Sequence, residues 1–144
     1  MRIAEFLNRT GKRVITIRRE DTVETASTLL ANNNIGALPV RDEDGGLVGV
    51  ISERDIVRGF AASGSRIHNL KVADLMSPKV ITCAPDDEVN QAMVLMSRHH
   101  IRHLPVVEDG NMLGIISSRD VMAVVIEDMK LEREVLRDMA IVRG

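Results

Sequence analysis

Two short polar segments with one pattern are the best candidates for binding chemistry. They are residues 52–55 (SERD) and 117–120 (SSRD), and helical spacing follows each of them. A serine with an acid three residues later is typical of a capping box at the start of a helix. A carboxylate at a helix start can also accept hydrogen bonds from both hydroxyls of a ribose, and free backbone N–H groups beside it favour anions. The pattern thus has two interpretations, a cap and a ribose site, and they are compatible.

The segment 97–103 (SRHHIRH) is the most basic stretch of the chain and allows three interpretations. It suits a solvated helix end, because cations are favourable near the C-terminal pole of a helix dipole. His99 and His103 have the spacing of a metal pair, but Arg98 and Arg102 would repel a cation, so we predict no metal site. Arg102 and His103 could instead bind phosphate, since a guanidinium can hold two phosphate oxygens.

These segments belong to two copies of one sequence unit. Residues 14–40 align with residues 80–106 at an offset of 66, and residues 47–57 align with residues 112–122 at an offset of 65. A lead-in repeats as well, with IAEFL (3–7) matching VADLM (72–76). Similarity that keeps its register over this length with a single gap indicates an internal duplication.

Each copy is predicted to fold as β-α-β-β-α. The predicted strands are 14–17, 37–40 and 47–51 in the first copy and 80–83, 103–107 and 112–116 in the second, with acidic, glycine-containing hairpin turns. Asp21 with Glu24 is predicted to cap the first helix, which ends in the asparagines 32–34. One unit alone leaves apolar surface uncovered. The predicted fold class is therefore α+β, with two motifs packed sheet to sheet in pseudo-two-fold symmetry.

The predicted organisation is a first motif with its lead-in helix (1–62), a linker (63–71), a second motif with its lead-in helix (72–126) and a C-terminal helical extension (127–144). The last helix is predicted from about 118 to 140. Apolar residues recur along it at 3-4 spacing, interrupted by Glu132: Met122, Val125, Met129, Leu136 and Met139. Such a row is typical of packing on the helix's own domain or on a second chain. We favour a second chain, because the row extends past the repeat.

Composition disfavours several function classes. There is no Trp or Tyr and only two Phe, so base-stacking platforms for single-stranded nucleic acid are lacking. A net charge of −2 gives no general attraction to DNA or anionic membranes. The single cysteine, Cys83, cannot form an internal disulfide and is predicted to be a half-buried strand residue. We find no apolar run of membrane-spanning or signal-peptide length, which predicts a cytoplasmic protein.

The motifs GVISERDIV (49–57), GIISSRDVM (114–122) and LPVV (104–107) together resemble the CBS domain family, named after cystathionine β-synthase. The resemblance covers roughly residues 3–124 and implies a tandem CBS pair of the stand-alone prokaryotic type. CBS pairs bind adenosine-containing ligands (AMP, ADP, ATP, S-adenosylmethionine, sometimes NAD) between their two motifs. The resemblance thus implies a regulatory sensor that responds through rearrangement of its motifs or of a homodimer. It implies no required cofactor, and an effector protein as a possible further partner.

When the family's binding residues are assigned to the aligned positions of this chain, the resemblance implies two ligand-binding clefts. Each cleft is crosswise, because it takes its Thr from one motif and its Asp from the other. The first would contain Thr16, Gly36, Ala37, Ser117 and Asp120, and the second Thr82, Arg102, His103, Ser52 and Asp55. Both aspartates would hold ribose. Arg54 and Arg119 would add positive charge or remain solvated. The first copy has no cation where the second has Arg102 and His103, so we expect phosphates to bind better where Arg102, His103, Arg119 and Asp120 meet.

Two other function classes remain alternatives. The chain could be a structural or interaction module that binds no ligand. It could also be an enzyme, for example a slow nucleotide hydrolase. The sequence has no P-loop, no dinucleotide-binding glycine motif and no Ser-His-Asp order, so we predict no catalytic residues.

Overall fold

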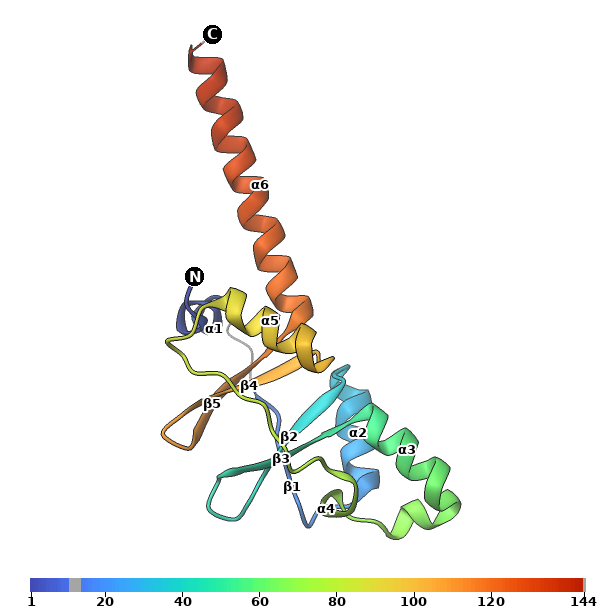
Figure 1. Cartoon of the computed structure of the whole chain (residues 1–144). Helices are drawn as coiled ribbons and strands as arrows, with labels where there is room; N and C mark the ends of the chain where they lie inside the picture. Colours follow the sequence, from blue (N-terminus) through green and yellow to red (C-terminus); the bar gives the residue numbers. More distant parts are fainter. Residues whose placement is uncertain (11–13, 144) are drawn as a thin grey trace.

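The two copies of the repeat form two small sheets with their own helices (Figure 1). The computed structural model describes residues 1–10 and 14–143. The first copy comprises β1 (Ile17–Arg18), α2 (Val23–Asn33), β2 (Ala37–Arg41), β3 (Leu47–Ser52) and α3 (Glu53–Ser63). The second copy comprises α5 (Val89–His99), β4 (His103–Glu108), β5 (Asn111–Ser117) and α6 (Ser118–Arg143). The lead-in of the first copy is α1 (Ile3–Thr10), and η1 (Gly64–Asn69) and α4 (Val72–Leu75) connect the copies.

The register of the sheets confirms the duplication residue by residue. β1 runs parallel to β2 with Ile17 opposite Val40, and Cys83 forms a parallel bridge to Val106 at the matching place in the second copy. Both hairpins, β2–β3 and β4–β5, are antiparallel and shift register at matching positions. The strands predicted at 14–17 and 80–83 are shorter than expected. The first is reduced to the two residues of β1 and the second to the single bridge at Cys83, because only these positions pair with the hairpin beside them.

The predicted cap of the first helix is wrong by one residue. Thr22 is the N-cap of α2, and its hydroxyl oxygen accepts a hydrogen bond from the backbone N–H of Thr25 at 3.1 Å. The Asp21 carboxylate is engaged elsewhere, because it accepts from the backbone N–H of Arg18 at 3.0 Å and closes the preceding turn. At their C-termini, α2 and α5 end alike, on Asn34 and His100 in the left-handed conformation.

The lead-in helices are exchanged between the copies. α1 buries Ile3 and Phe6 in a hydrophobic core with second-copy residues, among them Leu104 and Ile116. α4 buries Val72 in the core of the first copy. Part of the apolar surface that each copy leaves uncovered is therefore closed by the lead-in of the other copy.

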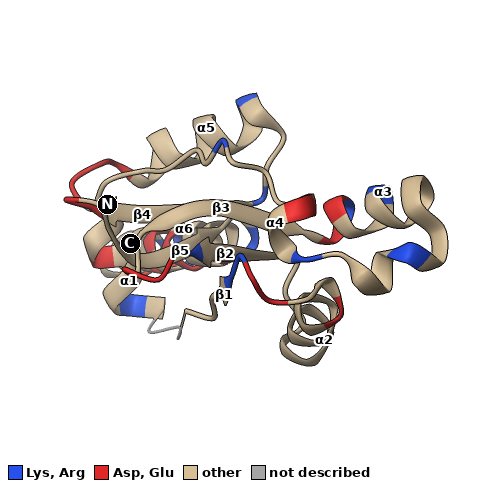
Figure 2. Cartoon of the chain, turned by 90° about the horizontal axis from the view of Figure 1, so that it is seen from below, with Lys and Arg blue, Asp and Glu red and all other residues tan. Residues whose placement is uncertain are grey.

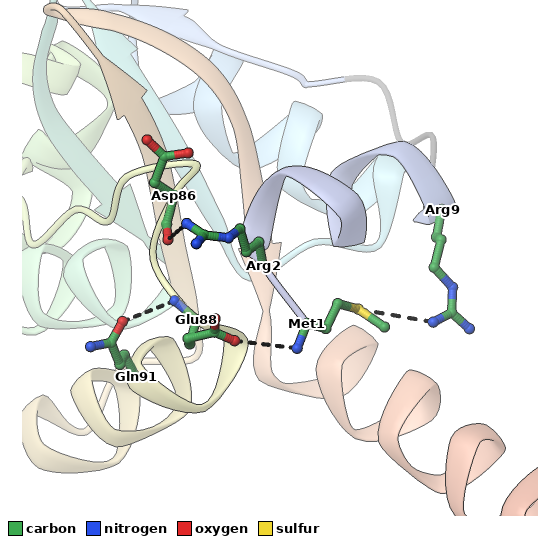
Figure 3. Close-up of polar contacts among 6 residues, drawn as sticks. All are labelled: Met1, Arg2, Arg9, Asp86, Glu88 and Gln91. Atoms are coloured by element: carbon green, nitrogen blue, oxygen red, sulfur yellow. Dashed lines mark hydrogen bonds and ion pairs between the residues drawn. The ribbon is translucent and has the colours of Figure 1, made fainter.

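Polar contacts hold the N-terminus on the second copy, as Figure 3 shows. The terminal amino group of Met1 lies 3.2 Å from Oε2 of Glu88. The guanidinium of Arg2 donates to the carbonyl of Asp86 at 3.0 Å. Backbone bonds from Ile3 to Asp87 and from Val89 to Met1 complete the attachment. These contacts join residues more than eighty positions apart, so the first lead-in ties the two copies together.

Two matching glycines mark where the exchanged lead-ins cross the sheets. A Cβ atom on Gly49 would lie 2.8 Å from the backbone oxygen of Ser77, and one on Gly114 would lie 2.9 Å from Cδ2 of Leu7. Side chains at these positions would collide with the crossing segment. The glycines of LVGVI and MLGII are therefore explained by close approach rather than by turn geometry.

α6 extends far beyond the rest of the molecule (Figure 1). It is 26 residues long and continues slightly past the predicted end, to Arg143. Beyond Val124, every described side chain up to Val142 is exposed. Within the described residues, no helix, α6 included, combines the length and apolarity needed to cross a membrane.

The thiol of Cys83 is expected to be unreactive in the folded protein. Its side chain is only 5% exposed and lies 3.7 Å from the carbonyl oxygen of Pro105, to which it can donate. Burial, with a smaller contribution from the negative charge of Asp87, raises its pKa to about 12. Because the thiolate is the reactive form, a disulfide reagent at pH 8 should modify Cys83 only after denaturation.

The raised pKa also predicts a pH dependence of stability. Above pH 9 the thiol loses its proton in the unfolded chain but keeps it in the folded one, so the unfolded state binds fewer protons. The free energy of unfolding should therefore fall between about pH 9 and 12. Denaturation of the wild type and of Cys83→Ala across this range measures the contribution. Equal slopes for both proteins, or rapid modification at pH 8 without denaturant, would contradict the expectation.

Candidate functional site

The helix-cap interpretation of the repeated Ser-x-x-Asp pattern is confirmed. The hydroxyl oxygen of Ser52 accepts from the backbone N–H of Asp55 at 3.2 Å, and Oδ2 of Asp55 accepts from the backbone N–H of Ser52 at 2.8 Å. The Ser52 hydroxyl also lies 2.9 Å from the same oxygen. In the second copy, the N–H of Asp120 donates to the Ser117 hydroxyl at 3.1 Å. All bonds described for the Asp55 side chain use Oδ2, which leaves Oδ1 for a ligand.

Within each copy, the hairpin register brings the predicted site residues together. Ala37 lies opposite Ser52 at the start of α3, and His103 lies opposite Ser117 at the start of α6. The carbonyl of Gly36 accepts from Glu53 at 3.0 Å, and the carbonyl of Arg102 accepts from Ser118 at 2.9 Å. A carbonyl oxygen has two lone pairs, so each of these two keeps one for a ligand. Each copy thus presents a strand start beside a helix start.

The two sets of residues meet at the junction of the copies. A Cβ atom on Gly36 would lie 3.4 Å from Cε1 of His103, an ordinary van der Waals distance. The first-copy residues Ala37, Ser52 and Asp55 therefore share one region with His103 of the second copy. The register places residues of the same copy side by side, and the crosswise pairing of Thr with Asp stays a prediction.

The two threonines differ in their surroundings. Thr16 is half-buried and directly precedes Ile17, whereas Thr82 is exposed and directly precedes Cys83. Continuing the parallel register places Thr16 level with Pro39 and Thr82 level with Pro105. Thr16 is therefore level with a residue two positions after Ala37, and Thr82 is level with a residue two positions after His103. The two threonines occupy equivalent places in their sheets but differ in how far solvent reaches them.

Positive charge is concentrated on the second copy's side of the junction. Arg102 and Arg119 are exposed there, and His103 is half-buried. The matching positions of the first copy are Gly36, Arg54 and Ala37. In Figure 2, α3 carries acidic and basic residues together. In its sequence, Arg54 stands between Glu53 and Asp55. The phosphate-binding preference predicted for the second copy stays a prediction.

A family model for the CBS domain matches the chain twice, at residues 4–62 and 72–127. The chain belongs to the CBS domain family. It carries two CBS motifs in tandem, and its fold is the α+β fold of a CBS pair with a C-terminal helix added.

Relatives and solved structures agree with this assignment. The CBS domain-containing protein YhcV of Bacillus subtilis is 35% identical over 74% of this chain and 75% of its own length. The mitochondrial CBS domain-containing protein CBSX3 of Arabidopsis thaliana is 38% identical over 78% of this chain, which spans only 57% of that protein. The crystal structure of the CBS-domain containing protein ATU1752 from Agrobacterium tumefaciens superposes with a TM-score of 0.81, at 32% identity over 86% of this chain and 98% of that one.

One solved relative carries ligands. The CBS domain pair of protein MJ0100 was crystallised with 5′-methylthioadenosine and S-adenosyl-L-methionine. It is 30% identical to this CBS pair, covers 89% of this chain and 98% of its own, and superposes with a TM-score of 0.76. A CBS pair of this fold can thus bind adenosine-containing molecules.

The spacing of His99 and His103 does not make a metal pair in this CBS pair. α5 ends at His99, His100 adopts the left-handed conformation, and His103 begins β4. The two imidazoles are therefore not carried by one helical turn, as the four-residue spacing requires. Among the described residues, no three His, Cys, Asp or Glu side chains cluster closely enough to hold a metal ion.

Two surface hollows lie away from the junction. One, of about 210 Å³, lies between α6 and the N-terminus and is lined by Met1, Val89, Val125 and Met129, among others. The other, of about 350 Å³, lies on α5 beside Val94 and Leu95. Neither includes a residue predicted to bind ligand. The junction is instead marked by its capping contacts and by the register of its hairpins.

Proposed function

We propose that this CBS pair is a regulatory module that binds an adenosine-containing ligand at the junction of its two motifs. The observation that carries the proposal is the match, over most of both chains, to the CBS pair of MJ0100, whose structure contains S-adenosyl-L-methionine and 5′-methylthioadenosine. AMP, ADP, ATP and NAD share the adenosine group and are further candidates. No catalytic step is proposed, because the two CBS motifs account for most of the sequence.

The chemistry of the junction supports this ligand class. Asp55 offers Oδ1 to the ribose hydroxyls while its Oδ2 caps α3. Asp120 at the start of α6 has the matching position. Free carbonyl lone pairs at Gly36 and Arg102 suit the amino group on the adenine edge. Arg102 and His103 are the groups to which we assign phosphates, since the fork of a guanidinium binds two oxygens.

A ligand at this junction would act on the angle between the copies. Gly36 and His103 belong to different copies and lie close together there, since a Cβ atom on Gly36 would be 3.4 Å from Cε1 of His103. A ligand that contacts both copies binds some relative arrangements of them better than others, and so shifts the population toward these. A partner protein that recognises one arrangement would then sense the ligand.

Titration calorimetry with AMP, ADP, ATP, NAD, S-adenosylmethionine and 5′-methylthioadenosine tests the proposal. At least one of them should release or absorb heat on binding and raise the melting temperature. A ligand at about a hundred times its Kd stabilises the folded state by about 2.7 kcal/mol, which is easily detected. Neither heat nor a thermal shift from any of the six would refute ligand binding. ATP that remains unchanged after long incubation would separate a sensor from a hydrolase.

The exposed apolar row on α6 favours the alternative of an interaction module. Large apolar side chains exposed together on a surface are typical of contact sites with other proteins. The two functions can coexist in one chain. They separate experimentally, because a purely structural module would keep its assembly state and bind none of the six molecules.

A further inference from the structure

Two arginines lie side by side at one end of the first sheet. Arg18 and Arg41 are Cα partners in the parallel pairing of β1 with β2. Neighbouring strands are about 4.8 Å apart, and partners in register point to the same face of the sheet. Arg18 is exposed and Arg41 is half-buried. Ala37 begins β2 at the junction, whereas Arg41 ends this strand about 13 Å further along, so the two arginines lie away from the proposed adenosine site.

The fold does not require arginine at either position. At the offset of 66 between the copies, Arg18 corresponds to Ala84 and Arg41 corresponds to Val107. Val107 has the same place in its hairpin as Arg41, since both hairpins shift register just before this residue. The second copy therefore builds the same strand ends without charge, and the two arginines of the first copy need a reason other than folding.

Among the described residues, no acid neutralises either guanidinium. Neither arginine side chain forms an ion pair there. The carboxylate of Asp21 accepts from the backbone N–H of Arg18. The carboxylate of Asp42 accepts from the backbone N–H groups of its own turn, at Asp44 and Gly46. Like charges directly opposite each other destabilise a sheet, so this pair costs stability when nothing is bound to it.

Arg41 also carries an unpartnered polar atom. In the described part of the chain, its Nε is the one buried side-chain nitrogen or oxygen without a hydrogen-bond partner. A buried donor without an acceptor is destabilising. An anion at the pair would offset the repulsion of the two charges. It would also give Nε an acceptor when the side chain shifts toward solvent, because Nε and a terminal nitrogen together form one fork of the guanidinium.

We propose that Arg18 and Arg41 form a binding site for a phosphate group, separate from the junction and independent of adenosine binding. Two guanidinium forks match the charge and the oxygens of a phosphate dianion. The neighbouring turns also contain three exposed acids, Glu20, Glu43 and Asp44. These acids favour a compact anion, because they would repel an extended polyanion such as nucleic acid or an anionic membrane. The phosphate is either free inorganic phosphate or the ester group of a small molecule.

Titration calorimetry with inorganic phosphate and with glycerol 3-phosphate tests the site. The buffer contains chloride at constant ionic strength and pH 8, where a phosphate ester with its second pKa of about 6 is a dianion. Arg18→Gln and Arg41→Gln should each lower the affinity about tenfold or more, because each removes a charge-assisted contact. Arg66→Gln is the matched control and should bind like the wild type, since it removes the same charge from an exposed arginine of η1 that forms no ion pair with a described residue.

The outcomes separate this site from the junction. Binding of both probes, or of the ester alone, supports the site, and the second result assigns the phosphate to a larger molecule. Absence of binding by either probe, or unchanged affinity in both Arg18→Gln and Arg41→Gln, would overturn the proposal. Phosphate binding that is lost in Arg102→Gln but kept in these two variants would place the anion at the junction and would also overturn it.

Thermal unfolding provides a second, independent measurement. The double variant Arg18→Ala, Arg41→Val carries the second copy's residues at both positions. Without phosphate it should melt above the wild type, because it lacks the like-charge pair and the unpartnered Nε. Phosphate should raise the melting temperature of the wild type and leave that of the double variant unchanged. A double variant that melts below the wild type, together with no effect of phosphate on the wild type, would show that the arginines only pack on the sheet. Circular dichroism checks that each variant is folded.

Discussion

Replacement of Phe6 by alanine is expected to lower the free energy of unfolding by about 3–5 kcal/mol, the usual range for a buried phenylalanine. Phe6 is 1% exposed and belongs to the core that also contains Leu104, Val106 and Ile116. Removal of its ring leaves a cavity in the core of the second copy, although in the sequence Phe6 belongs to the lead-in of the first copy. Urea denaturation followed by circular dichroism measures the change, because the chain has no Trp or Tyr for fluorescence.

The chain contains its own control for this experiment. Its other phenylalanine, Phe60 on α3, is 60% exposed. Phe60→Ala should change the free energy of unfolding by no more than about 0.5 kcal/mol, as surface substitutions usually do. Hydrogen exchange adds a readout of position: Phe6→Ala should reduce protection first in α5, β4 and β5. Equal stability of the two variants, or a first loss of protection in β2 and β3, would contradict the exchange of lead-ins.

The repeat made most of the fold predictable from sequence. Alternation and turn chemistry located both hairpins, and Ser52 with Asp55 predicted the start of α3 correctly. These features depend on residues close in sequence, which a linear pattern can report. Alignment of the copies then transferred each assignment from one half to the other, so errors in one copy could be checked against its equivalent.

The exchange of lead-ins could not be predicted in this way. The apolar spacing of Ile3 and Phe6 indicates that α1 is buried, but it contains no information on which core receives them. Both copies have similar apolar surfaces, so chain connectivity alone would favour the nearer one. The clearest sequence signal for the crossing is the pair Gly49 and Gly114, and its meaning depends on knowing that another segment passes there.

The predicted cap at Asp21 failed for a related reason. Asp21 and Thr22 are both good N-cap residues, and propensity does not choose between neighbours. The turn after β1 determines which of the two is the cap, because in this turn the Asp21 carboxylate accepts a hydrogen bond from the backbone N–H of Arg18. Thr22 is then left as the N-cap. In the candidate site, residue types were likewise readable from sequence, whereas the proximity of Gly36 to His103 required the arrangement of the two copies.

Loss of the carboxylate of Asp120 is expected to lower the affinity for phosphorylated adenosine ligands by about ten- to hundredfold. A hydrogen bond to a charged group contributes about 1.5–3 kcal/mol, and 1.4 kcal/mol corresponds to a factor of ten in affinity. Asp120→Asn is preferable to alanine, because an asparagine oxygen can still accept at the helix start. Its stability should fall by less than about 1 kcal/mol, the contribution of one charge at a helix terminus. Calorimetry with AMP and ATP measures the affinity.

Asp55→Asn and Glu53→Gln make this experiment decisive. Glu53 lies exposed at the start of α3, so Glu53→Gln removes the same charge near the junction without removing a proposed ribose ligand. Glu53→Gln should therefore bind AMP and ATP as the wild type does. If Asp120→Asn and Asp55→Asn also bind like the wild type, the proposed ribose role of both carboxylates is refuted.

The relative effects of the two aspartate variants identify the composition of the phosphate site. The hairpin register places His103 opposite Ser117, next to the start of α6 that carries Asp120. On this geometry Asp120→Asn should impair AMP and ATP more than Asp55→Asn does. The crosswise clefts implied by the family resemblance instead join His103 with Asp55, so they predict the reverse order. The two variants therefore measure whether each ligand is held mainly by one copy or shared between them, and only a shared ligand couples binding directly to the angle between the copies.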